Sequence, residues 1–448
     1  MFACPGNSII YAHKNQKPTN PVRIRDPIYG TIELEAWEVA LVDHPLFQRL
    51  RHIKQLGFGE LAFPGATHTR HSHSLGAMFL ASRLWASLQK KLPLPPRLLK
   101  RMEAALRVAA LLHDVGHLPF SHSLEKAAPL RARLQLPSWL SGAQGGLAKH
   151  EDFSLKLLLD SSLTPVLSRA LEPLEWRPED VAGLLSFATP PHGNVFVFEG
   201  IDYAPLLCSL IAGELDADRM DYLARDSFFT GVNYGRFDLD WLLHNMEVAV
   251  VDNRACLAIG QRAGFAFEDF LQSRWHMFLS VYYHRTSTAY EQMLLRYCQS
   301  AGDEFEVPLS SEDFIHFDDV SLLSKLRSSQ NPWAKRLVSR QVFRLVADFT
   351  ERDKHWTLES LCQLLGEAGV EHFPVQSKAQ LSRHNPQNNP LDLYVVDAEG
   401  GQCISVSEYS PLYAHWEAVH LSRVYVHPEH HEVAKRIVAQ ALKSRGCP

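Results

Sequence analysis

The chain has 448 residues, of which 46% are hydrophobic and 21% charged, and its formal net charge is −5 at pH 7. These values are typical of a globular protein. They exclude an overall basic surface for nucleic acid or an anionic membrane, so a nucleic-acid site is left open only as a local basic pocket. The seven cysteines are scattered and form no CxxC pair, which argues against a disulfide framework or a thiolate zinc site. No apolar run approaches the roughly 18 residues of a spanning helix, and we predict a cytoplasmic protein without a membrane segment.

The first 300 residues are predicted to be mainly helical. Residues 1–21 are polar and rich in Asn, Lys and Pro, so we expect a flexible N-terminal arm. An extended pair with a turn at Tyr29–Gly30 follows it. Apolar residues then recur three and four positions apart, which is the spacing of one helix face. This pattern predicts helices over residues 35–55, 70–91, 97–116, 152–159, 177–186, 204–226 and 268–300.

The sequence changes character after about Asp303. A further helix is predicted at HWTLESLCQLLGEAG, and LDLYVVDAEGGQCISVSEY indicates a hairpin with Gly400–Gly401 at its turn. The segment LSRVYV is typical of a strand, and the last predicted element is an amphipathic C-terminal helix. We therefore predict a mainly α protein with an arm at 1–21, an all-helical body over 22–300 and a smaller C-terminal α+β lobe over 301–448.

The segment LLHDVGHLPFSHSLE, which spans Leu111–Glu125, places three histidines and two carboxylates among apolar residues. Such polar groups are costly to bury unless something pairs with them. The adjacent His113 and Asp114 favour a metal ion as that partner over a hydrogen-bond network alone. A helix is predicted to end at Gly116, with Ser121 as the N-cap of the next one. A helix end allows neighbouring side chains to converge on one ion.

A metal site needs further ligands, and two other segments supply candidates. The segment TRHSHSLG contains His71 and His73. The segment ELDADRMDYLARD contains the carboxylates of Glu214, Asp216, Asp218, Asp221 and Asp226. A solvated acidic helix face is the alternative interpretation of the second segment, and it accounts for Asp216 and Asp221.

In chain order, His73, the His113–Asp114 doublet and Asp218 form an H…HD…D pattern. The flanking segments DPIYGTIEL, FQRLRHIKQLG, FPGATHTRHSHSLG, LLHDVGHLPFSH, KHE and DADRMDYLARD follow in order over residues 26–226. Together they resemble the HD-domain phosphohydrolases, in particular the dGTPase-like deoxynucleoside triphosphate triphosphohydrolases. The resemblance continues to about Leu294. It implies an HD-domain core that hydrolyses dNTPs to deoxynucleoside and inorganic triphosphate by attack of a metal-activated hydroxide on the α-phosphate.

The resemblance implies catalytic roles at matching positions. The implied metal ligands are His73, His113, Asp114 and Asp218. Two histidines and two aspartates suit iron, manganese, zinc or nickel, with magnesium as a candidate second ion. His117, His122 and His150 match histidines that line the phosphates, and Glu125 matches the acidic partner of His122. His122 would then serve as general acid or base with Glu125 orienting its ring, and Glu151 is expected to tune His150 similarly.

The resemblance also implies a substrate pocket. The matching positions carry Arg70, Arg219 and Arg274 for the triphosphate or base, Tyr222 and Tyr282 for the sugar, and Gln55 and Asp226 for the 3′-hydroxyl. A tyrosine against C2′ leaves no room for a 2′-hydroxyl, so a preference for deoxyribose is implied. A surface arginine and a core aromatic are the alternatives for Arg274 and Tyr282. Arg70 before it and SLG after it select His73 as the ligand over His68 and His71.

A regulatory site is implied as well. In animal members of the family, the region matching VRIRD and DHPLFQRLR forms an activating nucleotide site between subunits. Asp43, Gln48 and Arg51 match there, and an aspartate with an arginine suits the edge and phosphates of a guanine nucleotide. Val22 and Arg25 depart from the family's lysine and asparagine. We predict a homo-oligomer with a candidate nucleotide activator near these residues.

Two other functions stay open. One is an HD-domain phosphohydrolase for another nucleotide phosphate ester: a monophosphate, an alarmone or a cyclic dinucleotide. The other is a nucleotide sensor or nucleic-acid-binding module that keeps the site for binding. Arg70, Arg219, Tyr222 and Asp226 favour a triphosphate with a tight sugar pocket. The complete ligand set and the pairing of a histidine with Glu125 favour an enzyme.

Overall fold

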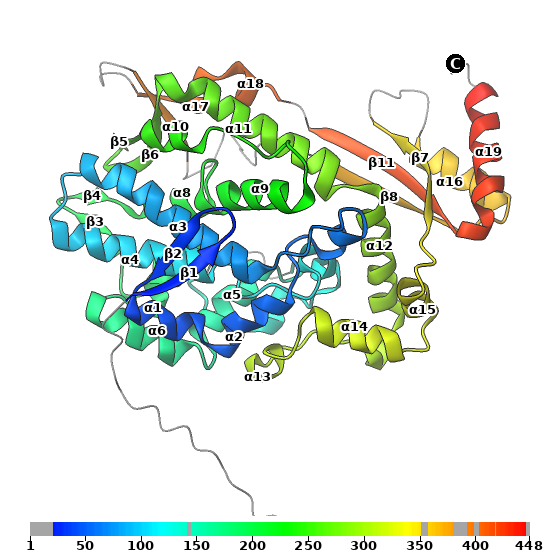
Figure 1. The fold of residues 1–448 in the computed structure, drawn as a ribbon, viewed down its shortest axis with the longest axis horizontal. Coiled ribbons are helices and arrows are strands. Elements are labelled where there is room, and N and C mark those ends of the chain that lie inside the picture. The colour runs from blue at the N-terminus through cyan, green and yellow to red at the C-terminus, as the bar shows by residue number, and fades with distance from the viewer. Residues whose placement is uncertain are drawn as a thin grey trace, which may run out of the picture.

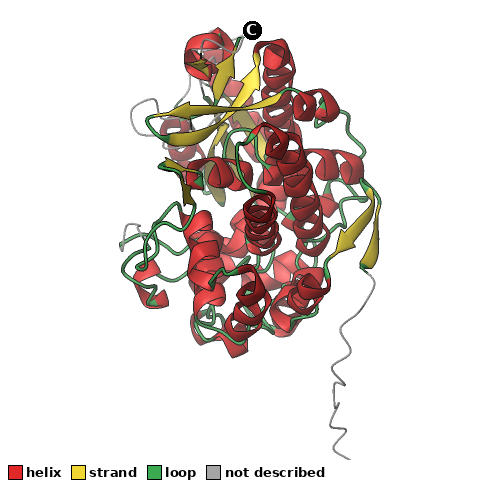
Figure 2. Ribbon diagram, turned by 90° about the vertical axis from the view of Figure 1, so that its left-hand side faces the viewer, coloured by secondary structure: helices red, strands yellow, loops and turns green. Residues whose placement is uncertain are grey.

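The computed structural model describes residues 21–140, 145–350, 357–379, 392–397, 403–416 and 418–444. It is mainly helical, and three small sheets lie around the helices (Figures 1 and 2). This confirms the predicted class of a helical body with a smaller α+β part. No helix in the described ranges is both long enough and apolar enough to cross a membrane. Nearly all of the predicted flexible arm lies outside the described residues.

The N-terminal hairpin has the predicted form. Strand β1 (Val22–Asp26) pairs antiparallel with β2 (Gly30–Leu34). The predicted helix over 35–55 is wrong, because the chain forms α1 (Ala36–Val42), α2 (Pro45–Gln48) and a 3₁₀ turn instead. Pro45 cannot continue the ladder of backbone hydrogen bonds, and a residue that precedes proline avoids the helical region, so His44 is extended.

The long helices α3 (Arg70–Leu88) and α4 (Pro96–Leu112) pack side by side, on the left in Figure 1. Helix α3 also packs against α9 (Ala217–Thr230). At Gly76 a Cβ atom would lie 1.9 Å from an oxygen of Asp221 and 2.3 Å from a terminal nitrogen of Arg225. Glycine at this position of α3 therefore leaves room for the Asp221–Arg225 pair of α9.

Two long predicted helices are broken. The segment 204–226 divides into α8 (Ala204–Ala212) and α9, because Gly213 is extended and Asp216 caps the new helix. The segment 268–300 divides into α11 (Gly264–Met277), a π-helical turn at Phe278–Tyr282 and α12 (Arg285–Ser300). The remaining helices of this part are α5 (His150–Leu159), α6 (Thr164–Leu171), α7 (Pro178–Ser186) and α10 (Leu239–His244).

A six-stranded sheet crosses the predicted boundary at residue 300. Its strands are β3 (Val197–Phe198), β4 (Ile201–Asp202), β5 (Met246–Val251), β6 (Arg254–Gly260), β9 (Tyr394–Val396) and β10 (Cys403–Ser405). Strands β9 and β10 form the predicted hairpin, whose Gly400–Gly401 turn lies outside the described residues. Since β9 pairs with β6, part of the C-terminal lobe continues the body.

The other C-terminal elements form two groups. Helices α14 (Asp319–Ser328) and α15 (Pro332–Val338) follow α12, and α15 packs against it. Helix α13 (Ser311–Phe314) lies at the bottom of the molecule in Figure 1, where Phe314 stacks on Phe153 of α5. Strands β7 (Arg344–Phe349), β11 (Val419–Val426) and β8 (His372–Ala379) form an antiparallel sheet. Helices α16 (Leu358–Glu367) and α19 (His431–Ser444) share a small apolar core with this sheet. Two short helices, α17 (Val406–Tyr409) and α18 (Pro411–Ala414), lie between β10 and β11 in the sequence.

Candidate active site

Three helices bring the four predicted metal residues together. His73 lies in the first turn of α3, His113 and Asp114 directly follow α4, and Asp218 lies in the first turn of α9. His73 Nε2 is 3.0 Å from an oxygen of Asp218 and 3.5 Å from one of Asp114. His113 Nε2 is 3.3 Å from Asp114 and 3.5 Å from Asp218. We call these four residues the metal group.

Each imidazole of the metal group is fixed by its other nitrogen. His73 Nδ1 lies 2.8 Å from Asp221 Oδ2, and His113 Nδ1 lies 2.7 Å from the carbonyl of Ala110. These acceptors hold a proton on Nδ1 and leave the Nε2 lone pair available for an ion. Both Nε2 atoms are buried and have no hydrogen-bond partner among the described residues. The donor set therefore fits a divalent transition metal.

The charge of the metal group leads to the same conclusion. Burial lowers the pKa of His73, but the carboxylates of Asp218 and Asp221 outweigh burial and raise it to about 10. Several carboxylates that converge on a buried point require positive charge there. A divalent cation supplies that charge while the imidazoles remain neutral ligands.

The interpretation of Asp216 and Asp221 as a solvated acidic face is wrong, because both side chains are buried. Asp216 caps α9 through its side chain. Asp221 accepts two hydrogen bonds of 2.9 Å from Arg225, whose other terminal nitrogen donates to Asp26 at 2.9 Å. A buried ion-pair network thus supports the carboxylate that orients His73. The spacing of Asp221 and Arg225 by four residues indicates an ion pair on one helix face, but it does not indicate that the pair is buried.

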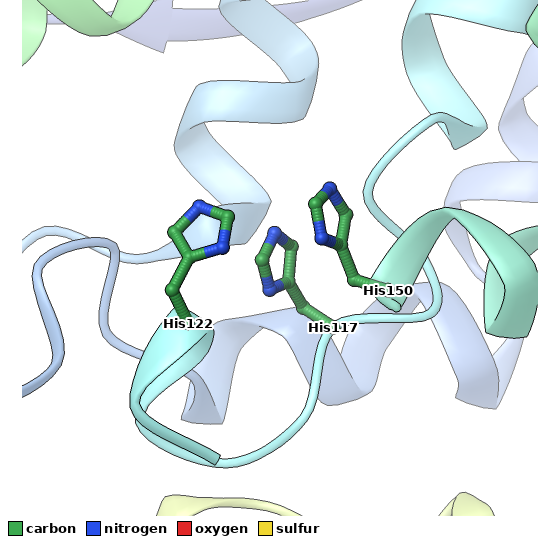
Figure 3. A group of neighbouring side chains, drawn as sticks. All are labelled: His117, His122 and His150. Carbon is green, nitrogen blue, oxygen red and sulfur yellow. The ribbon is translucent and has the colours of Figure 1, made fainter. Parts of the chain in front are cut away.

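A second cluster lies next to the metal group. Figure 3 shows His122 from the 3₁₀ turn Ser121–Ala127, His117 from the preceding loop and His150 from the start of α5. The rings of His117 and His150 stack with centroids 4.0 Å apart. Glu125 Oε1 lies 3.0 Å from His122 Nδ1 and 2.6 Å from His150 Nδ1. We call these three histidines and Glu125 the histidine group.

The surroundings shift the pKa values of His117 and His150 in opposite directions. Burial, together with nearby Arg70 and His150, holds the pKa of His117 well below its usual value. Burial lowers the pKa of His150 too, but Glu151 and Glu125 reverse this and raise it. Glu151 was the expected partner of His150, yet its oxygen is 3.3 Å away and Glu125 is nearer. The two stacked rings therefore have pKa values shifted in opposite directions.

One cavity of about 470 Å³ joins both groups to the predicted substrate residues. Its lining includes His113, Asp114 and Asp218 of the metal group, and His122 and His150 of the histidine group. All seven predicted substrate residues line it as well: Gln55, Arg70, Arg219, Tyr222, Asp226, Arg274 and Tyr282. The structure therefore gathers residues from the first 300 positions around a single space of ligand size.

The tyrosine–aspartate wall of the cavity is a connected network. Tyr282 OH donates to Asp226 Oδ2 at 2.8 Å, and Tyr222 meets Tyr282 edge to face with centroids 6.1 Å apart. Asp226 Oδ1 lies 2.8 Å from Nε2 of His68. This role of His68 could not be predicted, because no local spacing connects two residues 158 positions apart. His71 is buried against Phe47, apart from the metal group.

The predicted phosphate-binding arginines are partly engaged by the protein. Arg70 donates to Asp114 Oδ2 at 2.7 Å and to Ser121 Oγ at 3.0 Å, so it joins the metal group to the turn before His122. Arg219 donates to Glu214 at 2.8 Å. Both cations line the cavity, and these contacts fix their orientation before any substrate binds.

The predicted activator residues lie elsewhere. Asp43 ends α1, and Gln48 accepts a hydrogen bond of 2.7 Å from Arg51 just beyond α2. None of the three is part of the described lining of the cavity. Their regulatory role stays a prediction.

Comparisons with known proteins connect this geometry to a family. The HD domain model matches residues 70–180, and the model of the HD associated region matches residues 237–357. The chain is 30% identical over 435 residues to the uncharacterized protein YwfO of Bacillus subtilis, and the match covers 90% of each chain.

The match to a relative with a named activity covers a smaller share of that relative's length. Human deoxynucleoside triphosphate triphosphohydrolase SAMHD1 is 30% identical over 292 residues, which are 63% of this chain and 45% of the human protein. Among solved structures, a hypothetical protein from Aquifex aeolicus aligns over 94% of this chain and 100% of its own with a TM-score of 0.72 and 26% identity. A phosphohydrolase from Bacteroides thetaiotaomicron aligns over 91% of this chain and 100% of its own with a TM-score of 0.64 and 26% identity.

Proposed function

The chain belongs to the HD-domain family of metal-dependent hydrolases, and on that premise we propose that it hydrolyses deoxynucleoside triphosphates to deoxynucleoside and inorganic triphosphate. One observation carries the proposal. A single cavity of about 470 Å³ is lined by metal-group residues, by His122, by cationic side chains and by a tyrosine–aspartate wall. Substrate, metal and proton donor would therefore meet in one place.

The metal group would hold the ion. A divalent metal in such a site polarises phosphoryl oxygens and lowers the pKa of bound water, which provides a nucleophile near neutral pH. Arg70 keeps Asp114 oriented as a ligand through their hydrogen bond of 2.7 Å. Asp221 does the same for His73 from the opposite side of the ring.

The histidine group would assist the leaving group. Hydrolysis at the α-phosphate breaks the bond to the 5′-oxygen, which must take up a proton. His122 lines the cavity and uses Nδ1 to contact Glu125, so Nε2 is the nitrogen available to donate that proton. Glu125 fixes the orientation of the ring. Arg219 and Arg274 would hold the triphosphate, and Tyr222 and Tyr282 would exclude a 2′-hydroxyl.

The test is product analysis with purified protein. Each dNTP and NTP is incubated with Mn²⁺ or Mg²⁺, singly and in pairs, and the products are separated by chromatography. We expect deoxynucleoside and inorganic triphosphate from dNTPs and little turnover of NTPs. Turnover only in mixtures would support an activator at Asp43, Gln48 and Arg51. Release of pyrophosphate or orthophosphate, or cleavage of another nucleotide ester alone, would overturn the proposal in favour of a different HD-domain phosphohydrolase.

A further inference from the structure

We infer that Asp319, at the start of α14, is a positioning residue for His122. It lies 199 residues beyond Phe120 in sequence, in the HD associated region, and the lining of the cavity includes no atom of it. The inference rests on the proposed function, because it assigns to this region the task of holding the general acid in place.

The chain must turn sharply just before His122. Phe120 and Ser121 both have left-handed backbone conformations, with φ of 56° and 57°. Residues other than glycine adopt this conformation at a cost, and two in succession persist only where the surroundings hold them. The turn decides the direction in which His122 leaves the backbone, so whatever holds the turn also places the ring.

Asp319 holds this turn through both carboxylate oxygens. Oδ1 accepts the N–H of Phe120 at 2.6 Å, and Oδ2 accepts the N–H of Lys54 at 3.0 Å. Ser121 Oγ donates to the carbonyl of Lys54 at 2.7 Å. The three hydrogen bonds form a closed ring that ties the turn to the backbone beside Gln55, which lines the cavity.

The same region also holds the other end of the loop. Arg49 is buried, and it donates to the carbonyl of Phe317 at 2.6 Å, of His117 at 2.7 Å and of Val115 at 3.0 Å. The backbone around residues 317–319 is thus fastened to both ends of the segment that carries His117 and His122. The HD associated region therefore fixes the position of the segment that carries His117 and His122.

Helix capping does not explain Asp319. The N-cap of α14 is Asp318, whose side chain accepts from the backbone of Ser321 at 2.8 Å. A buried carboxylate is costly, and this one is compensated by two backbone N–H groups from elsewhere in the chain. His122 needs such support, because its own side chain is 61% exposed and its one described side-chain hydrogen bond is to Glu125.

The test is Asp319→Asn with Asp318→Asn as its matched control. Asparagine keeps one acceptor oxygen and replaces the other by an N–H₂ group, which opens the ring. We expect kcat for the dNTP to fall about 10- to 100-fold, the loss typical of a catalytic group displaced by about 1 Å. KM and the metal content per chain should stay unchanged, and Asp318→Asn should stay within about twofold of the wild type, since asparagine also caps helices.

A kcat for Asp319→Asn equal to that of Asp318→Asn would overturn the positioning role. Ser121→Ala opens the same ring at another bond and leaves the buried carboxylate in place, although it also removes the acceptor of Arg70. If Asp319→Asn does not fold, retention of kcat in Ser121→Ala provides the test. Unchanged kcat in folded Ser121→Ala would count against the inference. Absence of dNTP turnover in the wild type would instead contradict the proposed function, which keeps the two failures distinct.

Discussion

The metal group and the histidine group share one cavity, but the protein holds them differently. His73 and Asp114 are buried at helix ends, and both metal-group imidazoles are fixed through Nδ1 by acceptors in the protein. In the histidine group, His122 stands on a 3₁₀ turn with its side chain 61% exposed. A single oxygen of Glu125 serves two imidazoles there.

This difference fits the division of labour that we propose. An ion requires fixed ligand geometry, which buried helix ends supply. The proposed general acid must instead reach an oxygen of the substrate, and His122 lines the cavity from its turn. Asp114 connects the two groups, because its Oδ1 is 3.3 Å from Nε2 of both His113 and His117. Substitutions in the metal group should therefore change metal content, and those in the histidine group should change kcat alone.

The largest effect is expected from Asp114→Asn. The variant removes one ligand charge and weakens the link to Arg70. Loss of the ion forfeits several kcal/mol of transition-state stabilisation, so activity should fall by at least about 10³-fold. Metal per chain, measured by mass spectrometry of the purified protein, should fall with it. Asp240→Asn, at a side chain that is 84% exposed, is the control. Full metal content in Asp114→Asn would contradict the assignment of this ligand.

The next effect tests the histidine group. Glu125→Gln replaces the shared acceptor and should lower kcat by at least about 10²-fold, the lower range for a positioned acid or base. Metal content should not change, which separates the two groups. Glu151→Gln is the matched control, since Glu151 is 3.3 Å from His150 and its side chain is 49% exposed. If the two variants lose activity equally, Glu125 has no special role.

A smaller effect on catalysis is expected at Asp221, which orients His73 of the metal group. Asp221→Asn weakens the acceptor of His73 Nδ1–H and should lower metal affinity about 10- to 100-fold, as for other supports of metal ligands. Removing one charge of the buried pair with Arg225 should also cost about 3–5 kcal/mol of stability. Metal titration below the unfolding temperature measures the first effect, and thermal unfolding measures the second. Saturating metal should restore kcat, and failure to restore it would show that Asp221 acts on the reaction itself.

The sequence predicted the parts of this site that depend on apolar periodicity or on short motifs in a fixed order. The helices that start at Arg70 and end near His113 follow from apolar periodicity, and the metal group follows from three short segments. Breaks such as the one at Gly213 were missed, because the apolar pattern continues across them while the backbone does not.

Contacts between single polar atoms far apart in sequence could not be predicted. His68 with Asp226 and Phe120 with Asp319 are separated by 158 and 199 residues. Periodicity reports which face of an element is apolar, and it carries no information on which distant carboxylate meets a given N–H. Asp221 was misjudged because acidic helix residues are mostly exposed, and an aspartate with an arginine four residues later suits a surface pair equally well.

The smallest effect is expected at the tyrosine–aspartate wall. Tyr282→Phe removes the hydroxyl that donates to Asp226 at 2.8 Å but keeps the ring that would exclude a 2′-hydroxyl. A hydrogen bond to a charged group contributes about 1.5–3 kcal/mol. In the variant, Asp226 keeps its contact with His68 through Oδ1, so only part of this energy should be lost. We therefore expect KM for the dNTP to rise about 3- to 10-fold. kcat and the preference for dNTPs over NTPs should be nearly unchanged.

Tyr282→Ala removes the ring as well, and it should relax that preference. A loss of sugar selectivity in Tyr282→Phe itself would mean that selection depends on the hydroxyl network rather than on the shape of the wall.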